Sequence, residues 1–189
     1  MTPLLIGTVG VTNTGKTTLF DRLRLIPHYG FIEVGKEMRK RHPPEFFKGL
    51  GAMKDTESEV WEIVAEHYQA AISAGATVIF CDGQPRMREH VVELQRRFGD
   101  YSLIQLHAPF ELLTTRASIR DAGDPSKQRL NEQRLHNDYR QLYDTLAEYH
   151  MQTGRVSYLV DATQSPDKVA TTVIRRVEHW ITEQQTEHS

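Results

Sequence analysis

Short apolar runs alternate with amphipathic stretches along the whole chain. A short apolar run bounded by turn residues is typical of a strand that is buried on both faces of a sheet. The pattern predicts five strands, at Leu4–Thr8, Phe31–Val34, Thr77–Asp82, Leu103–His107 and Val156–Val160. Because helical patterns separate them, we expect the strands to run parallel, with helices on both faces and ligands beyond their carboxyl ends. The predicted fold class is therefore α/β, a three-layer α/β/α domain around a five-stranded parallel sheet.

Punctuating residues predict where the helices begin and end. Thr56 and Glu59 fit a capping box, and Gly75 fits the end of the same helix. Asp124-Pro125 and Ser165-Pro166 are start signals for two later helices. Apolar residues at helical spacing predict buried faces at Val60, Ile63, Val64, Tyr68, Ala71 and Ile72, at Val91, Val92 and Leu94, at Leu142, Tyr143, Leu146 and Tyr149, and at Val169, Val173, Val177 and Ile181.

Two stretches break the alternation of strands and helices. Residues 39–54, RKRHPPEFFKGLGAMK, lack strand character, and their Pro-Pro and Gly-x-Gly interrupt any long helix. Ala117–Lys127 is a second irregular, charged stretch. Such segments commonly hold a second substrate or close over a site. We therefore predict a helical acceptor-binding insertion at about residues 35–75, where the acceptor is the second substrate. We also predict a short lid at about residues 117–127.

Residues 10–17, GVTNTGKT, fit the pattern G-x-x-x-x-G-K-[ST] of a phosphate-binding loop. Glycine permits backbone angles that turn successive N–H groups towards an anion, and the following helix points the positive end of its dipole there. We expect Lys16 to reach the β- and γ-phosphates and the Thr17 hydroxyl to bind Mg²⁺. The predicted nucleotide-binding residues are Gly10, Thr12, Asn13, Thr14, Gly15, Lys16, Thr17 and Thr18, and the implied cofactors are ATP and Mg²⁺.

The run VIFCDGQPRM at residues 78–87 supplies a second set of candidates. It places Asp82 at the end of a strand, where a carboxylate can hold Mg²⁺ or its waters beside a triphosphate. Arg86 follows, and a guanidinium group matches phosphate oxygens in a bidentate way. The predicted metal ligands are therefore Thr17 and Asp82.

Composition and charge narrow the class of protein. A chain of 189 residues has the size of one domain, and its net charge of −2 gives no electrostatic footprint for tight non-specific binding to nucleic acid. The single cysteine, Cys81, lies in an apolar run and fits a reducing compartment. Without a visible targeting or membrane-spanning segment, the expected location is the cytoplasm. The N-K-x-D element of GTPase switches does not occur, and the nine histidines show no paired metal-ligand spacing.

Together these motifs resemble the adenylate kinase-like family of nucleoside monophosphate kinases over nearly the whole chain. Residues 10–17 resemble its phosphate loop, VGKEMR at 34–39 resembles T-G-D-L-L-R, and DGQPR at 82–86 resembles D-G-F-P-R. The resemblance implies that Arg39 and Arg86 bind the acceptor phosphate, with Gly35 and Gly83 beside them.

The resemblance continues towards the C-terminus. RASIRDAGD at 116–124 resembles a short form of the lid, which implies that Arg116 contacts the donor base and Arg120 the transferring phosphates. QRLNEQRLHNDY at 128–139 resembles the arginine-bearing helix after the lid, which makes Arg134 a candidate and Arg129 its rival. YLVDAT at 158–163 resembles the terminal strand and turn. The implied catalytic residues are Lys16, Asp82, Arg86, Arg116 and Arg120.

Four positions depart from the family's pattern. Val34 and Lys36 stand in place of the threonine and aspartate of T-G-D, and Gln84 stands in place of the phenylalanine of D-G-F-P-R. His90 stands in place of the glutamine that reads adenine in the adenylate enzymes, and we keep it among the expected substrate-binding residues. Because these positions surround the acceptor base, we expect phosphoryl transfer without specificity for AMP.

Three functions are compatible with the sequence. The first is an ATP- and Mg²⁺-dependent kinase of nucleoside or deoxynucleoside monophosphates. The second is a kinase of the same fold acting on a hydroxyl, either of a small metabolite or of a hydroxymethylated base in DNA. Its base would be Glu33, Glu37 or Asp82, and its nucleic-acid contact would be RKRH at 39–42 with an exposed Phe46-Phe47. The third is a nucleotide-binding regulator without turnover.

No membrane partner is expected. The sequence leaves open the oligomeric state and the preference among ATP, GTP and dATP as the phosphate donor.

Overall fold

The computed structural model describes residues 2–43, 46, 56–120, 122 and 125–187. Within them lie five strands, β1 (Leu4–Val9), β2 (Tyr29–Ile32), β3 (Val78–Asp82), β4 (Ser102–His107) and β5 (Tyr158–Asp161). The same residues form seven helices, α1 (Lys16–Leu23), α2 (Val34–Arg41), α3 (Glu57–Ser73), α4 (Arg88–Phe98), α5 (Phe110–Arg120), α6 (Pro125–Thr153) and α7 (Pro166–Glu187).

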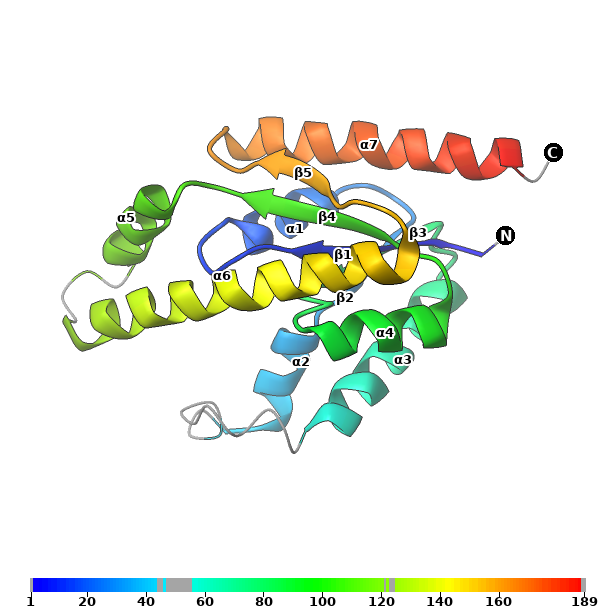
Figure 1. Ribbon diagram of the computed structural model, residues 1–189. Helices are drawn as coiled ribbons and strands as arrows, with labels where there is room; N and C mark the ends of the chain where they lie inside the picture. Colours follow the sequence, from blue (N-terminus) through cyan, green and yellow to red (C-terminus); the bar gives the residue numbers. More distant parts are fainter. Residues whose placement is uncertain (1, 44–45, 47–55, 121, 123–124, 188–189) are drawn as a thin grey trace.

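The five strands form one parallel sheet in the order β2-β3-β1-β4-β5. Figure 1 shows α1 and α7 on one face of this sheet and α3, α4 and α6 on the other. This arrangement confirms the predicted α/β class and is consistent with three layers. Since β1 is central and all strands point the same way, the segments that follow β1, β3 and β4 meet at one edge of the sheet.

The start of α1 is fixed by aromatic packing behind it. The Phe20 ring meets Phe31 of β2 and Phe80 of β3 edge-on, with centroids 5.5 and 6.0 Å apart, and Phe31 stacks on Phe80 at 5.8 Å. Edge-to-face and offset pairs of this kind add stability beyond the area they bury. The residues before α1 are therefore held at a fixed place relative to the strand ends.

Several predicted helix boundaries are confirmed. Gly75 ends α3 with a positive φ of 79°, and the Ala76 N–H donates to the Ala71 carbonyl at 3.0 Å, as in a Schellman motif. Helices α6 and α7 begin at Pro125 and Pro166. Each of these boundaries has a local sequence signal, which is why the sequence alone located it.

Two strands lie elsewhere than predicted. Strand β2 is Tyr29–Ile32 and not Phe31–Val34, because its pairing with β3 begins at Tyr29 opposite Val78, and Val34 already opens α2. The last strand starts at Tyr158, opposite Ile104, and Val156 before it is 78% exposed. Both errors come from reading the apolar run as the strand, whereas pairing with the neighbouring strand sets its ends.

The two irregular stretches are more helical than predicted. Residues 39–41 belong to α2, which ends where His42 becomes extended before a proline, the conformation that a following proline favours. Residues 117–120 complete α5, with Ala117 buried at 4% exposure, and α6 already begins at Pro125. The stretch is therefore not irregular throughout, because helix covers both of its ends, and its role as a lid stays a prediction. Residues 44–45, 47–55, 121 and 123–124 lie outside the described part of the chain.

Four side chains depart from their predicted roles. Thr56 occupies the N-cap position of α3, but its side chain makes no capping hydrogen bond, so the predicted capping box is wrong. Ile72 is 37% exposed, Val92 43% and Tyr143 65%, so none of these three lies on the buried face to which the spacing assigned it. Each directly follows a buried or partly buried residue of the same helix, and neighbouring helical positions point about 100° apart.

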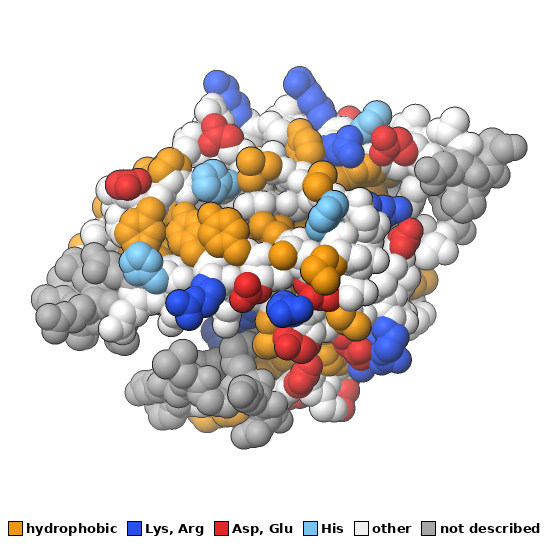
Figure 2. Space-filling model, viewed as in Figure 1, with side chains coloured by type: hydrophobic (Ala, Val, Ile, Leu, Met, Phe, Trp, Pro, Cys, Tyr) orange, Lys and Arg blue, Asp and Glu red, His pale blue; other side chains and the backbone are white. Residues whose placement is uncertain are grey.

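The surface carries charges of both signs. On the face drawn in Figure 2, hydrophobic side chains gather towards the middle, and acidic and basic side chains are interspersed around them. No helix among the described residues combines the length and the apolar character needed to cross a bilayer.

A substitution at Gly7 tests the close packing of the central strand. A Cβ at this position would lie 2.8 Å from the Gln84 carbonyl oxygen and 2.9 Å from Leu103 Cδ1. Gly7→Ala is therefore expected to lower the free energy of unfolding by about 1–3 kcal/mol, the cost of overpacking a core. Urea unfolding measures it.

Gly35→Ala is the matched control. A Cβ there would meet only Arg39 Nη1 at 3.6 Å, and the position lies in α2, where alanine is the better helix former. Equal losses in both variants would contradict the packing argument.

Candidate functional site

The Gly10–Thr17 loop joins β1 to α1 and leaves the N-terminus of that helix open. Gly15 is the N-cap residue in the left-handed region, with φ 94°, and Asn13 also has a positive φ of 69°. An added Cβ at Gly15 would meet nothing within 4 Å, whereas one at Gly10 would lie 2.9 Å from both the Leu106 carbonyl oxygen and Thr14 Oγ1. The loop is thus tightly packed where it leaves β1 and open where it enters α1.

Lys16 is the first residue of α1, and its ammonium group turns back over the loop. Nζ donates to the carbonyl oxygens of Gly10 at 2.5 Å and Val11 at 3.2 Å. Burial lowers the pKa of this ammonium from 10.5 to about 8, although the nearby Asp82 carboxylate acts in the opposite direction. The loop therefore holds a cation that lacks a full counter-charge.

Asp82 and Arg86 follow β3 on the same edge of the sheet. Asp82 pairs with Thr8 in the register of β1 and β3, and Gly83 then turns the chain with a φ of 70°. Burial raises the pKa of the Asp82 carboxyl, and Lys16 opposes this shift. Burial also lowers the pKa of the Arg86 guanidinium, and its strongest opposing charge is Asp138.

The charged groups of the site act on one another across four elements and the loop. Lys16 and Arg86 each interact with the same two carboxylates, and further cations approach from α2 and α6. The cluster comprises the cations Lys16, Arg39, Arg86 and Arg134 and the carboxylates Asp82 and Asp138. Glu33 also acts on Asp82, but its own carboxylate pairs with Arg24 at 2.5 Å. Cations exceed the two carboxylates, so the cluster favours an anionic ligand.

Helix α5 brings two predicted arginines to the loop. Arg116 donates through Nη1 to the Asn13 carbonyl oxygen at 3.3 Å and through Nη2 to the Ala162 carbonyl oxygen at 2.9 Å. Arg120 donates to the Asn13 Oδ1 atom at 2.8 Å. Residues predicted for the donor side therefore lie together, and their roles towards a ligand stay predictions.

Asp138 is a site residue that the sequence did not reveal. Its Oδ2 atom accepts hydrogen bonds from the Thr12 backbone N–H at 2.9 Å and from the Thr12 hydroxyl at 2.6 Å. No motif marks this contact, since 126 residues separate the partners. The one available signal is helical phase, because Asp138 lies three positions after Leu135 and four before Leu142, which are both buried.

His90 is buried beside the site at 2% exposure. Its Nδ1 lies 2.5 Å from the Gln84 Oε1 atom, and Trp61 packs against the imidazole edge-on with centroids 5.4 Å apart. Burial, with a smaller effect from Arg86, lowers the pKa of His90 to about 4, so the ring is neutral at physiological pH. A substrate contact for His90 stays a prediction.

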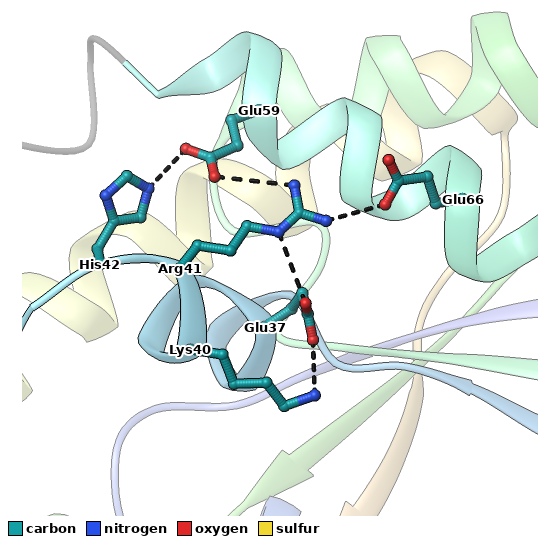
Figure 3. Close-up of polar contacts among 6 residues, drawn as sticks. All are labelled: Glu37, Lys40, Arg41, His42, Glu59 and Glu66. Atoms are coloured by element: carbon teal, nitrogen blue, oxygen red, sulfur yellow. Dashed lines mark hydrogen bonds and ion pairs between the residues drawn. The ribbon is translucent and has the colours of Figure 1, made fainter.

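Helix α2 carries Gly35 and Arg39 and is held against α3 by the polar cluster in Figure 3. Arg41 donates to Glu66 at 2.9 Å and lies 3.8 Å from Glu59, and His42 Nε2 lies 2.7 Å from the Glu59 carboxylate. Arg41 and Glu66 are exposed, and an exposed ion pair contributes about 0–1 kcal/mol. Val34 and Met38 of the same helix are buried in the core, so packing holds α2 together with these ion pairs.

Several residues of the stretch proposed for nucleic-acid contact make contacts within the protein. The Phe46 ring stacks on His42 at 4.0 Å between centroids and packs against the core, so it is partly buried and not exposed as predicted. Lys40 pairs with Glu37 at 2.8 Å. Phe47 lies outside the described residues.

The expected metal ligands lie at the open end of the loop. Thr17 and Thr18 are exposed in the first turn of α1, and Asp82 ends β3. Within the described part of the chain, no group of three or more His, Cys, Asp or Glu side chains could hold a metal ion. A lone carboxylate with a hydroxyl still suits Mg²⁺, because this ion keeps several waters and takes other ligands from substrate phosphates. The side chain of Arg129, the rival of Arg134, is not among those described.

No protein-family model matches this chain, and a search of curated proteins finds no match either.

The lowered pKa of Lys16 predicts a pH-dependent cost to stability. The unfolded chain binds the Lys16 proton up to pH 10.5 and the folded chain only up to about 8, so folding stability rises with pH across this window. Lys16→Met removes the charge and is expected to raise the free energy of unfolding at neutral pH by up to about 3 kcal/mol. Urea unfolding at neutral and alkaline pH measures it. A variant less stable than wild type at neutral pH would contradict the prediction.

The lowered pKa of His90 predicts acid sensitivity. Because the unfolded chain takes up this proton near pH 6.5 and the folded chain only near 4, stability is full above 6.5 and falls as the pH drops towards 4. His90 alone accounts for about 3 kcal/mol of this loss. Unfolding of wild type and His90→Gln across this window measures the difference. Parallel curves for the two proteins would show that His90 does not contribute.

Proposed function

We propose that this protein is an ATP- and Mg²⁺-dependent phosphotransferase whose acceptor is a nucleoside or deoxynucleoside monophosphate. The observation that supports it is the cluster in which Lys16, Arg39, Arg86 and Arg134 outnumber Asp82 and Asp138 beside the open N-terminus of α1. A triphosphate and an acceptor phosphate together supply the missing negative charge.

The donor side of the proposal uses the loop. Backbone N–H groups around Gly15 and the Lys16 ammonium would bind the β- and γ-phosphates, as helix N-termini bind anions. Thr17 and Asp82 would hold Mg²⁺, which would neutralise negative charge on the phosphates. Arg116 and Arg120 lie close enough to the loop to meet the donor after releasing Asn13.

The acceptor side uses Arg86 and Arg39, with Arg134 beside them. In the reaction, an oxygen of the acceptor phosphate forms a bond to the γ-phosphorus as the bond to the β–γ bridging oxygen breaks, giving ADP and a nucleoside diphosphate. The acceptor oxygen is already anionic, so no general base is required. Arginines held in place stabilise the charge that spreads over the transferring group.

A hydroxyl acceptor is the second candidate, and one observation favours it. The raised pKa of Asp82 suits a carboxylate that accepts a proton from a hydroxyl. For this second candidate, the acceptor would be a small metabolite or a hydroxymethylated base in DNA. The excess of cations favours the monophosphate, since it brings its own charge.

We also propose a cytoplasmic location. Cys81 is fully buried and unpaired, and burial raises the pKa of its thiol. A buried, unpaired thiol is typical of proteins in a reducing compartment, where disulfides are rare.

The test is ADP release from ATP·Mg²⁺ with a panel of ribo- and deoxynucleoside monophosphates and an oligonucleotide containing a hydroxymethylpyrimidine. We expect one or more monophosphates to stimulate release, Lys16→Ala to abolish it, and Arg86→Ala to lower kcat/KM for the acceptor by about 10²–10³. Arg155→Ala is the control, because Arg155 is exposed and pairs with Asp100. Stimulation by the oligonucleotide alone would establish the second candidate, and binding of ATP without stimulation by any acceptor would favour a regulator.

A further inference from the structure

Asp138 joins two parts of the site that the sequence keeps far apart. On the donor side it holds Thr12 through both the backbone N–H and the hydroxyl, at 2.9 and 2.6 Å. On the acceptor side it is the strongest charge that opposes the burial of Arg86. It also acts on Lys16. One carboxylate on α6 therefore touches the loop and acts electrostatically on Arg86.

We propose that Asp138 is a positioning residue that fixes the Gly10–Thr17 loop and whose negative charge offsets Arg86 until an acceptor phosphate takes over that role. This inference rests on the proposed function for its last step, while the hold on the loop stands on the two hydrogen bonds from Thr12.

The charge arithmetic explains why an acid is needed there. Arg134 and Arg39 add to the repulsion on Arg86, and the Asp82 carboxylate also interacts with Lys16. Asp138 supplies a second negative charge, and an arriving phosphate would supply it more fully, because guanidinium and phosphate oxygens pair in a bidentate way.

The hold on the loop is tested without any nucleotide. Asp138→Ala removes both hydrogen bonds that the carboxylate accepts from Thr12, so it is expected to lower the thermal midpoint. In a chain of this size, each kcal/mol of stability lost lowers the midpoint by about 2–4 °C. If the bond to Thr12 carries the effect, Thr12→Val should cost much less in the Asp138→Ala background than in wild type. Asp144→Ala, an exposed acid on the same helix, is the control. Additive effects of the two substitutions would overturn the proposed hold on the loop.

The role of the charge is tested in turnover with Asp138→Asn, which keeps the shape and one acceptor oxygen. Misplacing Arg86 and the loop should lower kcat by about 10²-fold. The acceptor KM should stay level or fall, because a repelling carboxylate is gone. Asp138→Glu, with the charge restored, should recover part of kcat. Unchanged kcat in Asp138→Asn would overturn the link to Arg86.

If no acceptor stimulates wild type, the proposed function fails, and the thermal cycle with Thr12→Val still decides whether Asp138 holds the loop.

Discussion

An excess of positive charge at the carboxyl ends of β1 and β3 is the constraint on which the rest of the site depends. Four cations act within one cluster against two carboxylates, and burial lowers the pKa of two of them, Lys16 and Arg86. The cluster lies where β1 runs between two neighbouring strands and where Phe20, Phe31 and Phe80 hold α1 behind the loop.

The balancing acids come from different elements, and this distribution ties those elements together. Asp82 comes from β3 and Asp138 from α6, while α5 reaches the same loop through Arg116 and Arg120. The loop is therefore held from several sides. Helix α2, which carries Arg39, is held by ion pairs to α3 and by the buried side chains of Val34 and Met38.

Local chemistry explains what the sequence could predict. Gly75, Pro125 and Pro166 mark helix ends because each acts on its own backbone, and the glycines of the loop act in the same way. The register of β2 and the burial of His90 depend on partners distant in the chain, so their positions required the structure. Asp138 is the clearest case. It sits in a long helix without a motif, and only folding brings it to Thr12.

The number of cations also bears on which kind of protein this chain is. Binding a triphosphate needs the loop, the N-terminus of α1 and Lys16, and a protein that only sensed the nucleotide would need no more. Arg86 adds further repulsion, since Arg39 and Arg134 act on it, and under the proposed function a triphosphate on the loop would not fully offset this repulsion. A second anion beside the first would reduce it. The excess of cations therefore suits the proposed transfer between two phosphorylated ligands better than it suits a regulator that binds a single nucleotide.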